Sequence, residues 1–216
     1  MIKIIDPVTS IELLCLTIAI FFLGKDKQNF WTITLAYLVF VCCTEYFGKY
    51  IGAKYKNNLW VYNVFVFFEA AFISYGLYNC FKRYINPKPL FLFSSIIIYT
   101  IYFVVFIRNG VFAFNSITVS VMSVIFVLYC LYYYYLLLRD EHLLDITYHS
   151  EFWWLTAVLF YYFGSTTSNL FFGLFKSIKI GPYPLTYAIY ILLNWILYGL
   201  WAYSFICRAK QRKLQS

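Results

Sequence analysis

Two carboxylates lie inside apolar stretches of the chain that are long enough to cross a membrane. Glu69 is ten residues into the stretch 59–80, about 15 Å along a helix axis and therefore near mid-membrane. Glu45 lies near the outer end of the stretch 30–48. Ionisable side chains at such depth are costly and usually face a bundle interior or a water-filled cavity. We therefore expect these two acids, and no others, to lie at membrane depth.

The neighbours of the two acids suggest different roles for them. Lys49 lies one helical turn after Glu45, so an ion pair within the helix is the simpler explanation of Glu45. Glu69 has no such local partner. A functional or polar-network role is therefore the main expectation for Glu69. The alternative is a protonated carboxyl group that is hydrogen-bonded to a neighbouring helix.

Further polar residues lie at a similar depth in other apolar stretches. The densest polar run inside any of them is 164–169, and Ser116, Ser120 and Ser123 recur at helical spacing. Such residues could line an outward-opening polar cavity, but Ser, Thr, Gly and Asn also serve as ordinary helix-packing residues in membranes. The candidates for ligand binding or pore lining are Glu69, Glu45, Asn63, Tyr62, Ser120, Thr167, Asn169 and Asn194.

The most polar linker, 139–151, holds four of the nine acidic residues and both histidines. On a helix, His142, Asp145 and His149 would lie on one face and could present metal ligands. Because that spacing is common by chance, a solvated cytoplasmic face is the simpler interpretation, and we predict no metal and no cofactor. The residues expected to face a cytoplasmic partner are Arg139, Asp140, Glu141 and His142.

The elements that must position these side chains are seven predicted membrane-spanning helices in one transmembrane domain, 1–216. A bilayer core needs about 20 apolar residues per helix, and the connections here are too short for a second folded domain. The first helix is predicted to begin at a capping-box pattern, Thr9 to Glu12. The predicted spans are 10–23, 30–48, 59–80, 90–107, 112–138, 152–175 and 185–207.

The distribution of basic residues predicts the orientation of the chain. With seven spans, ten Lys and Arg residues share a side with the C-terminus and seven lie on the opposite side. We expect the chain to lie in the cell (inner) membrane. The positive-inside rule then places the C-terminus on the cytoplasmic side and the N-terminus on the outer side. An error in the short first helix would move only the N-terminus.

Composition excludes several classes of protein. The chain is 63% hydrophobic and only 12% charged, so a soluble domain could not cover its surface with polar groups. The net charge of +8 is explained by basic residues in loops and at the C-terminus, which would meet lipid headgroups. Nucleic-acid binding is not predicted, because the sequence has no basic stripe interleaved with exposed aromatic residues. The sequence contains none of the common hydrolase, P-loop or EF-hand motifs, so we predict a non-enzyme. The six cysteines form no CxxC pair and are predicted to pack as small apolar residues.

One short motif resembles a known group of proteins. The segment Asn57–Asn63, followed by Glu69, is similar to the start of the third helix in small bacterial seven-helix integral membrane proteins. The resemblance implies a compact heptahelical bundle and carries no established activity with it. The last predicted span has no lysine at its middle, so a retinal Schiff base is not expected.

Two functions of different classes fit these observations. The first is a sensor or accessory protein that binds a small or lipidic ligand in an outer-half polar cavity and signals to a cytoplasmic partner. The second is an oligomeric channel or pore-type effector of a stress or defence response, with Glu69 on the conduction path. The inner half of the predicted bundle is rich in Phe, Tyr and Leu, which favours the sensor.

Overall fold

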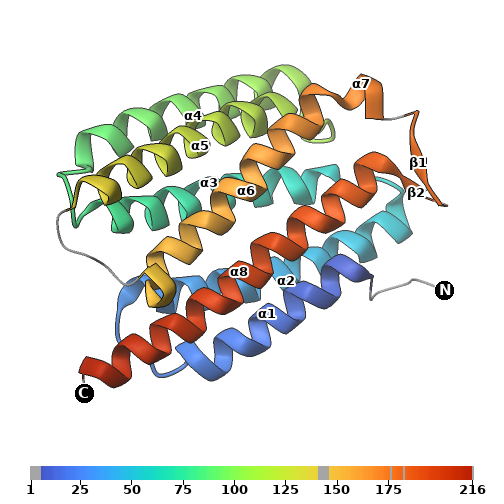
Figure 1. Ribbon diagram of the computed structural model, residues 1–216. Coiled ribbons are helices and arrows are strands. Elements are labelled where there is room, and N and C mark those ends of the chain that lie inside the picture. The colour runs from blue at the N-terminus through green and yellow to red at the C-terminus, as the bar shows by residue number, and fades with distance from the viewer. Residues whose placement is uncertain (1–5, 141–145, 176, 182, 216) are drawn as a thin grey trace.

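The protein is a bundle of long helices joined by short connections, as a computed structural model shows (Figure 1). The structure describes residues 6–140, 146–175, 177–181 and 183–215. The helices are α1 (Pro7–Leu23), α2 (Asn29–Tyr55), α3 (Leu59–Phe81), α4 (Lys88–Asn109), α5 (Ser116–Arg139), α6 (Ser150–Leu170), the one-turn α7 (Phe172–Phe175) and α8 (Leu185–Gln215). A short 3₁₀ turn, Ile146–Tyr148, precedes α6, and a two-stranded hairpin of β1 (Lys179–Ile180) and β2 (Tyr183–Pro184) precedes α8.

Five of the described helices are long and apolar enough to cross a membrane, namely α2, α3, α4, α5 and α8. The apolar helix α1 has 17 residues, about 26 Å at 1.5 Å per residue. Large apolar side chains cover the outside of the bundle, and Phe21 and Ile107 are 79% and 80% exposed. A surface of this kind is favourable in contact with lipid and unfavourable in contact with water. The chain is therefore an all-helical membrane protein.

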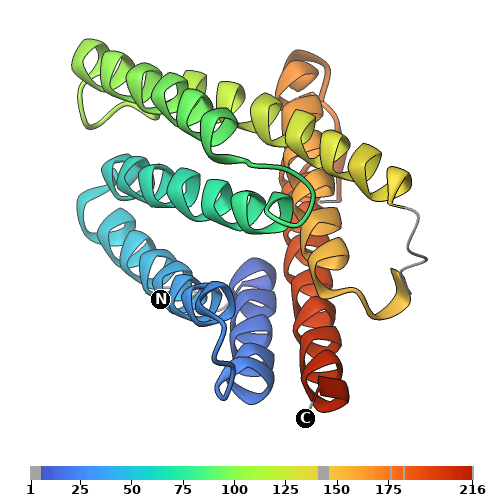
Figure 2. The ribbon, with the colours of Figure 1, turned by 90° about the vertical axis from the view of Figure 1, so that its left-hand side faces the viewer.

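Six helices form a closed ring, and a seventh lies outside it. Around the ring, α8 contacts α1, α1 contacts α2, α2 contacts α3, α3 contacts α5, α5 contacts α6, and α6 returns to α8. The remaining long helix, α4, packs on α3 and α5. Figure 2 shows α4 at the edge of the bundle, while α1 and α8 run side by side. The two helices are parallel, because Trp195 of α8 bonds to the carbonyl of Pro7 and Arg212 bonds to that of Phe22.

The start of α1 differs from the prediction. Asp6, and not the Thr9–Glu12 capping box, caps the helix: its side chain accepts hydrogen bonds from the backbone N–H groups of Val8 and Thr9 at 3.1 and 2.9 Å. Pro7 then occupies the first turn, where its missing N–H costs nothing. Glu12 is thereby released from a capping role and lies deeper in the helix.

Three other predicted helix ends were wrong. The last helix continues past the predicted end at Cys207 to Gln215. The second helix continues past Gly48 to Tyr55 and ends where Lys56 adopts a left-handed conformation with φ 60°. The sixth helix ends at Leu170 and not at Phe175, and α7 resumes for one turn after Phe171.

The fifth helix begins at Ser116 and not at Phe112 because Asn63 holds the preceding segment out of helical geometry. The Asn63 amide donates to the carbonyls of Val111 and Ala113 at 2.9 and 2.8 Å. Its carbonyl oxygen accepts the backbone N–H of Asn115 at 3.0 Å. The Asn115 side chain in turn caps α5 through the N–H of Thr118. This segment is therefore fixed by side chains from elsewhere in the bundle.

One half of the ring is filled by a dense aromatic core. Trp31, Trp154 and Trp201 are at most 1% exposed, and the rings of Trp154 and Trp201 stack at 5.7 Å with 5° between their planes. Gly76 permits this packing, because a Cβ at that position would lie 2.3 Å from the Trp154 ring. We call these three tryptophans with Phe30, Phe72 and Phe205 the aromatic floor.

Candidate functional site

A cavity lies directly above the aromatic floor, inside the ring of helices. Its inner chamber has a volume of about 50 Å³ and is lined by α1, α2, α3, α6 and α8. Its outer chamber has a volume of about 360 Å³ and adds α5 and the α4–α5 connection. Both chambers share the wall residues Glu45, Tyr62, Phe65, Glu69, Tyr161, Tyr162 and Tyr190.

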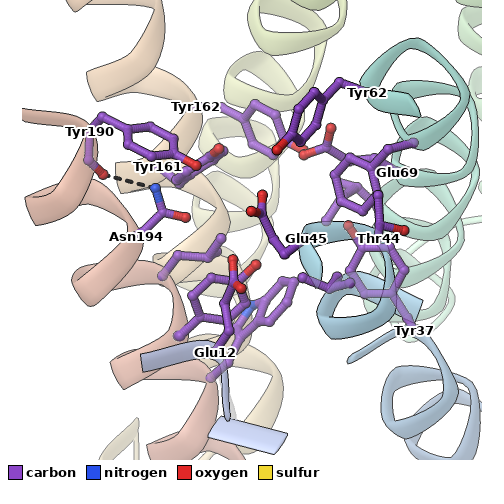
Figure 3. Close-up of a pocket in the computed structure, with 16 residues that line it drawn as sticks. Glu12, Tyr37, Thr44, Glu45, Tyr62, Glu69, Tyr161, Tyr162, Tyr190 and Asn194 are labelled. Carbon is purple, nitrogen blue, oxygen red and sulfur yellow. Dashed lines mark hydrogen bonds between the residues drawn. The ribbon is translucent and has the colours of Figure 1, made fainter. Parts of the chain in front are cut away.

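Three carboxylates from three helices point into the inner chamber. Figure 3 shows Glu45 of α2 between Glu12 of α1 and Glu69 of α3, all turned toward one space. Glu12 is 3% exposed. The sequence predicts only Glu45 and Glu69 for such a site and assigns Glu12 to the capping box, so the structure adds a third acid to the two expected. Its signal was present in the sequence: Glu12 shares a helical stripe with Val8, Cys15 and Ala19, all of which are buried.

The three acids have very different partners. Glu69 accepts a hydrogen bond from the hydroxyl of Tyr162 on α6 at 2.8 Å, a partner that lies 93 residues away in sequence and could not be read from local spacing. Glu45 lies 4.0 Å from Lys49, the pairing expected within α2. In contrast, Oε2 of Glu12 has no hydrogen-bond partner among the described residues. An unpartnered buried oxygen costs about 1–3 kcal/mol.

Lys49 closes the outer side of the acidic cluster. Its ammonium lies 2.9 Å from Asp6 and also donates to Thr9, so it ties α2 to the start of α1. Asp6 lies before the first turn of α1. Burial acts to raise the pKa of Asp6, but the hydrogen bonds from Thr9 and Lys49 outweigh it and hold that pKa below its ordinary value. The ion pair is therefore charged at neutral pH, and Glu45 keeps a long contact with Lys49 beside its hydrogen bond with Tyr62.

Aromatic rings form most of the remaining wall. Tyr37, Tyr161, Tyr162, Tyr190 and Tyr198 line the inner chamber together with Trp201 of the floor. A ring face carries partial negative charge and attracts cations. The cavity therefore combines carboxylates with aromatic rings, a lining suited to a small cation and above all to an ammonium group.

The predicted site residues separate into two groups. Glu45, Glu69 and Tyr62 line both chambers, Asn194 lines the inner one and Asn169 the outer one. Asn194 also donates to the carbonyl of Tyr190 at 2.8 Å (Figure 3).

The other predicted residues lie elsewhere. Asn63 is 1% exposed, and its side chain is hydrogen-bonded to the α4–α5 connection. Ser120 and Thr167 donate to carbonyls one turn back in their own helices, at 3.0 and 2.8 Å. These three side chains are used structurally.

Only part of the predicted partner-facing linker can be placed. Arg139 is exposed at the end of α5, and Asp140 lies 3.7 Å from Arg83 of the α3–α4 connection. Glu141, His142 and Asp145 lie outside the described residues.

His149 is placed at the start of α6. It caps that helix, accepting the N–H of Phe152 through Nδ1. Burial lowers the pKa of His149, in keeping with a neutral, hydrogen-bonded imidazole. Within the described residues no cluster of three or more metal-ligating side chains is found.

No family model matches this chain, and the comparisons with curated proteins and with solved structures return no match.

Proposed function

We propose that this chain is a non-enzymatic integral membrane sensor or accessory protein that binds a small organic cation in the acidic, aromatic cavity. The observation that carries the proposal is the convergence of Glu12, Glu45 and Glu69 on one chamber, with an oxygen of Glu12 left without a partner. Carboxylates at membrane depth are stabilised by a cation or by water. A bound ammonium group would supply the missing partner.

The chemistry of the lining supports an ammonium ion over a metal ion. Metal sites need several ligands at about 2.0–2.6 Å from one centre, and the described residues contain no such cluster. An alkylated ammonium instead spreads its charge over a larger surface and is recognised by ring faces together with a carboxylate. The inner chamber would hold the charged group, and the outer chamber has room for the rest of the ligand.

The proposal includes a topology of seven spans, with the N-terminus outside and the C-terminus in the cytoplasm. The parallel course of α1 and α8 supports it, because first and seventh spans cross in the same direction. The 21 residues of α6 are enough for about 31 Å. In this orientation the outer chamber faces the outside, and Arg139 and Asp140 lie on the cytoplasmic side with the C-terminus. A cytoplasmic protein or a second copy would receive the signal there.

Choline and its uncharged isostere 3,3-dimethyl-1-butanol provide a direct test. We expect choline to raise the melting temperature of the purified protein in detergent in a saturable way, because a ligand that binds only the folded state stabilises it. The isostere has the same shape without the charge and is expected to have no effect. Glu69→Gln should weaken the response to choline, and Glu151→Gln, which removes a carboxylate outside the cavity, should preserve it. Equal responses to the two compounds would contradict a cation site.

An oligomeric pore or channel is the second candidate, and the position of Glu69 on the wall shared by both chambers favours it. The aromatic floor argues against a path through one copy, because Trp154 and Trp201 are at most 1% exposed below the inner chamber. Ion flux in liposomes that carry wild-type protein or Glu69→Gln distinguishes the two candidates. Flux that Glu69→Gln abolishes would establish the pore, whereas tight liposomes from protein that still responds to choline would support the sensor.

A further inference from the structure

A second hollow lies on the outside of the bundle, between the end of α1 and the last turns of α8. This groove has a volume of about 740 Å³ and is separate from the acidic cavity. Its apolar part is formed by Phe21, Phe22, Ile206 and Ala209. Phe21 is 79% exposed, so the groove is open on the side that faces lipid.

Basic side chains border the same groove at the end of the two helices. Lys25, Lys210, Arg212 and Lys213 line it, and Lys25 and Lys210 are exposed. The α1–α2 connection 24–28 and the α8 segment 206–213 together contain six basic residues and one acidic residue, Asp26. The groove is therefore apolar along the membrane and strongly positive at its end.

The base of the groove is held in place by Asp26. Its carboxylate accepts hydrogen bonds from Nε and a terminal nitrogen of Arg208 at 2.8 and 3.2 Å, and the Arg212 Nε lies at 3.4 Å. Arg212 also donates to the carbonyl of Phe22 at 2.6 Å. Since Arg208 already balances the single charge of Asp26, the remaining basic side chains leave a positive excess. The two helix ends that frame the groove are thus held together before any ligand binds.

We propose that this groove binds one anionic phospholipid, with the phosphate-bearing headgroup against Lys25 and Lys210 and an acyl chain along Phe21 and Ile206. The charge and the shape are complementary to such a lipid: acyl chains fill apolar grooves, and basic pockets between transmembrane helices bind anionic headgroups. The site lies in the leaflet on the side of the C-terminus. It is independent of the cation cavity and of the proposed sensor role, because the two hollows share no lining residue.

The probe is short-chain phosphatidylglycerol added to the purified protein in a neutral detergent, with phosphatidylcholine of the same chains and inorganic phosphate as comparisons. The readout is the concentration that gives half of the maximal shift in melting temperature. We expect phosphatidylglycerol to stabilise the wild type at the lowest concentration. Lys25→Gln with Lys210→Gln should raise that concentration about 25-fold, since each lysine near an anionic headgroup contributes about fivefold in affinity.

Lys54→Gln with Lys56→Gln provides the matched control. It removes the same number of charges at the far end of α2 and should leave the response to phosphatidylglycerol unchanged. Equal weakening by both double variants would overturn the site, because net charge alone would then govern binding. An equal response to phosphatidylcholine would contradict recognition of an anionic headgroup. An equal response to inorganic phosphate would contradict a lipid as the ligand. All four side chains are exposed lysines, so loss of folding does not obscure the result.

Discussion

The two ends of α1 show opposite ways of placing a carboxylate in this protein. At the end that meets the C-terminal part of α8, the Asp26 side chain is 1% exposed and is surrounded by Arg208, Arg212 and the N–H of Gln28. Toward the other end, Glu12 is 3% exposed and has an oxygen without a partner. The Asp26 carboxylate holds helices together, whereas the Glu12 carboxylate keeps an oxygen that can bind a ligand.

The same contrast extends through the whole bundle. Around Asp26 the ring of helices is filled by the aromatic floor, while around Glu12 it is hollow and lined by acids and tyrosines. Interiors gain their stability from close packing, so a hollow, charged region lowers stability and is typical of a binding site. The comparison therefore predicts that substitutions in the filled half reduce folding stability, whereas those in the hollow half reduce binding.

Gly76→Ala should have the largest effect, in the filled half. The added Cβ would lie 2.3 Å from the Trp154 ring, and overpacking of this kind costs about 3 kcal/mol. Thermal unfolding followed by circular dichroism measures the loss. Gly199→Ala on α8, where nothing lies within 4 Å of the new Cβ, is the matched control and should be neutral or slightly stabilising. Equal stability of the two variants would contradict the view that close packing around Gly76 contributes to folding stability.

Asp26→Asn should cost about 2 kcal/mol, because the charge-assisted hydrogen bonds from Arg208 and the ion pair with Arg212 are weakened. Its effect should also depend on pH. Burial acts to raise the pKa of Asp26, but hydrogen bonds from Arg208 and the Gln28 N–H outweigh it and hold the pKa below its ordinary value. The ionised Asp26 therefore contributes fully above its unfolded pKa of about 3.9, and the contribution disappears as the pH falls through the lower, folded value.

Stability measured between about pH 6 and pH 3 tests this dependence. The difference between wild type and Asp26→Asn should shrink at the acid end. A difference that stays constant across the range would mean that the carboxylate does not hold α1 to α8 through its charge.

Tyr162→Phe should have a smaller effect, at the border between the halves. It removes the hydrogen bond to Glu69 and leaves the ring contact with Phe126, so the cost in stability should be about 1 kcal/mol. Cation binding should weaken as well, because Glu69 loses the group that orients it. Tyr129→Phe removes a tyrosine hydroxyl bonded outside the cavity, to the carbonyl of Leu90. It should lower stability by a similar amount without changing binding.

Glu12→Gln should have the smallest effect on folding. Its Oε2 has no hydrogen bond to lose, the amide oxygen can keep the hydrogen bond from Tyr198, and the amide has nearly the same shape. Stability should therefore stay within about 0.5 kcal/mol of wild type. A large loss in thermal unfolding would show that Glu12 is paired in the folded protein after all, and would place it with Asp26 as a structural carboxylate.

Much of the fold could be predicted from the apolar runs, because their length selects membrane-crossing helices. The third and fourth helices begin and end within two residues of the predicted positions. Among the boundaries that failed, the start of α5 depends on a distant contact. The start of α5 is set by Asn63, 52 residues before Asn115, and no local pattern reports such a bond.

The candidate site was predictable only in part, for the same reason. Glu69 and Glu45 stand out because a carboxylate inside an apolar run is conspicuous. Glu12 was missed because it lies near a helix start, where an acid is ordinary. Its approach to the other two acids depends on how α1 packs against α2, which sequence spacing does not specify.

The most direct test is isothermal titration calorimetry of choline into purified wild-type protein and into Glu12→Gln at the same pH and detergent concentration. We expect saturable binding to wild type and at least tenfold weaker binding to Glu12→Gln, a loss of about 1.4 kcal/mol, with the melting temperature of the free protein unchanged. Equal affinity for choline in the two proteins would contradict the proposal, because the carboxylate with the unpartnered oxygen would then have no part in recognising a cation.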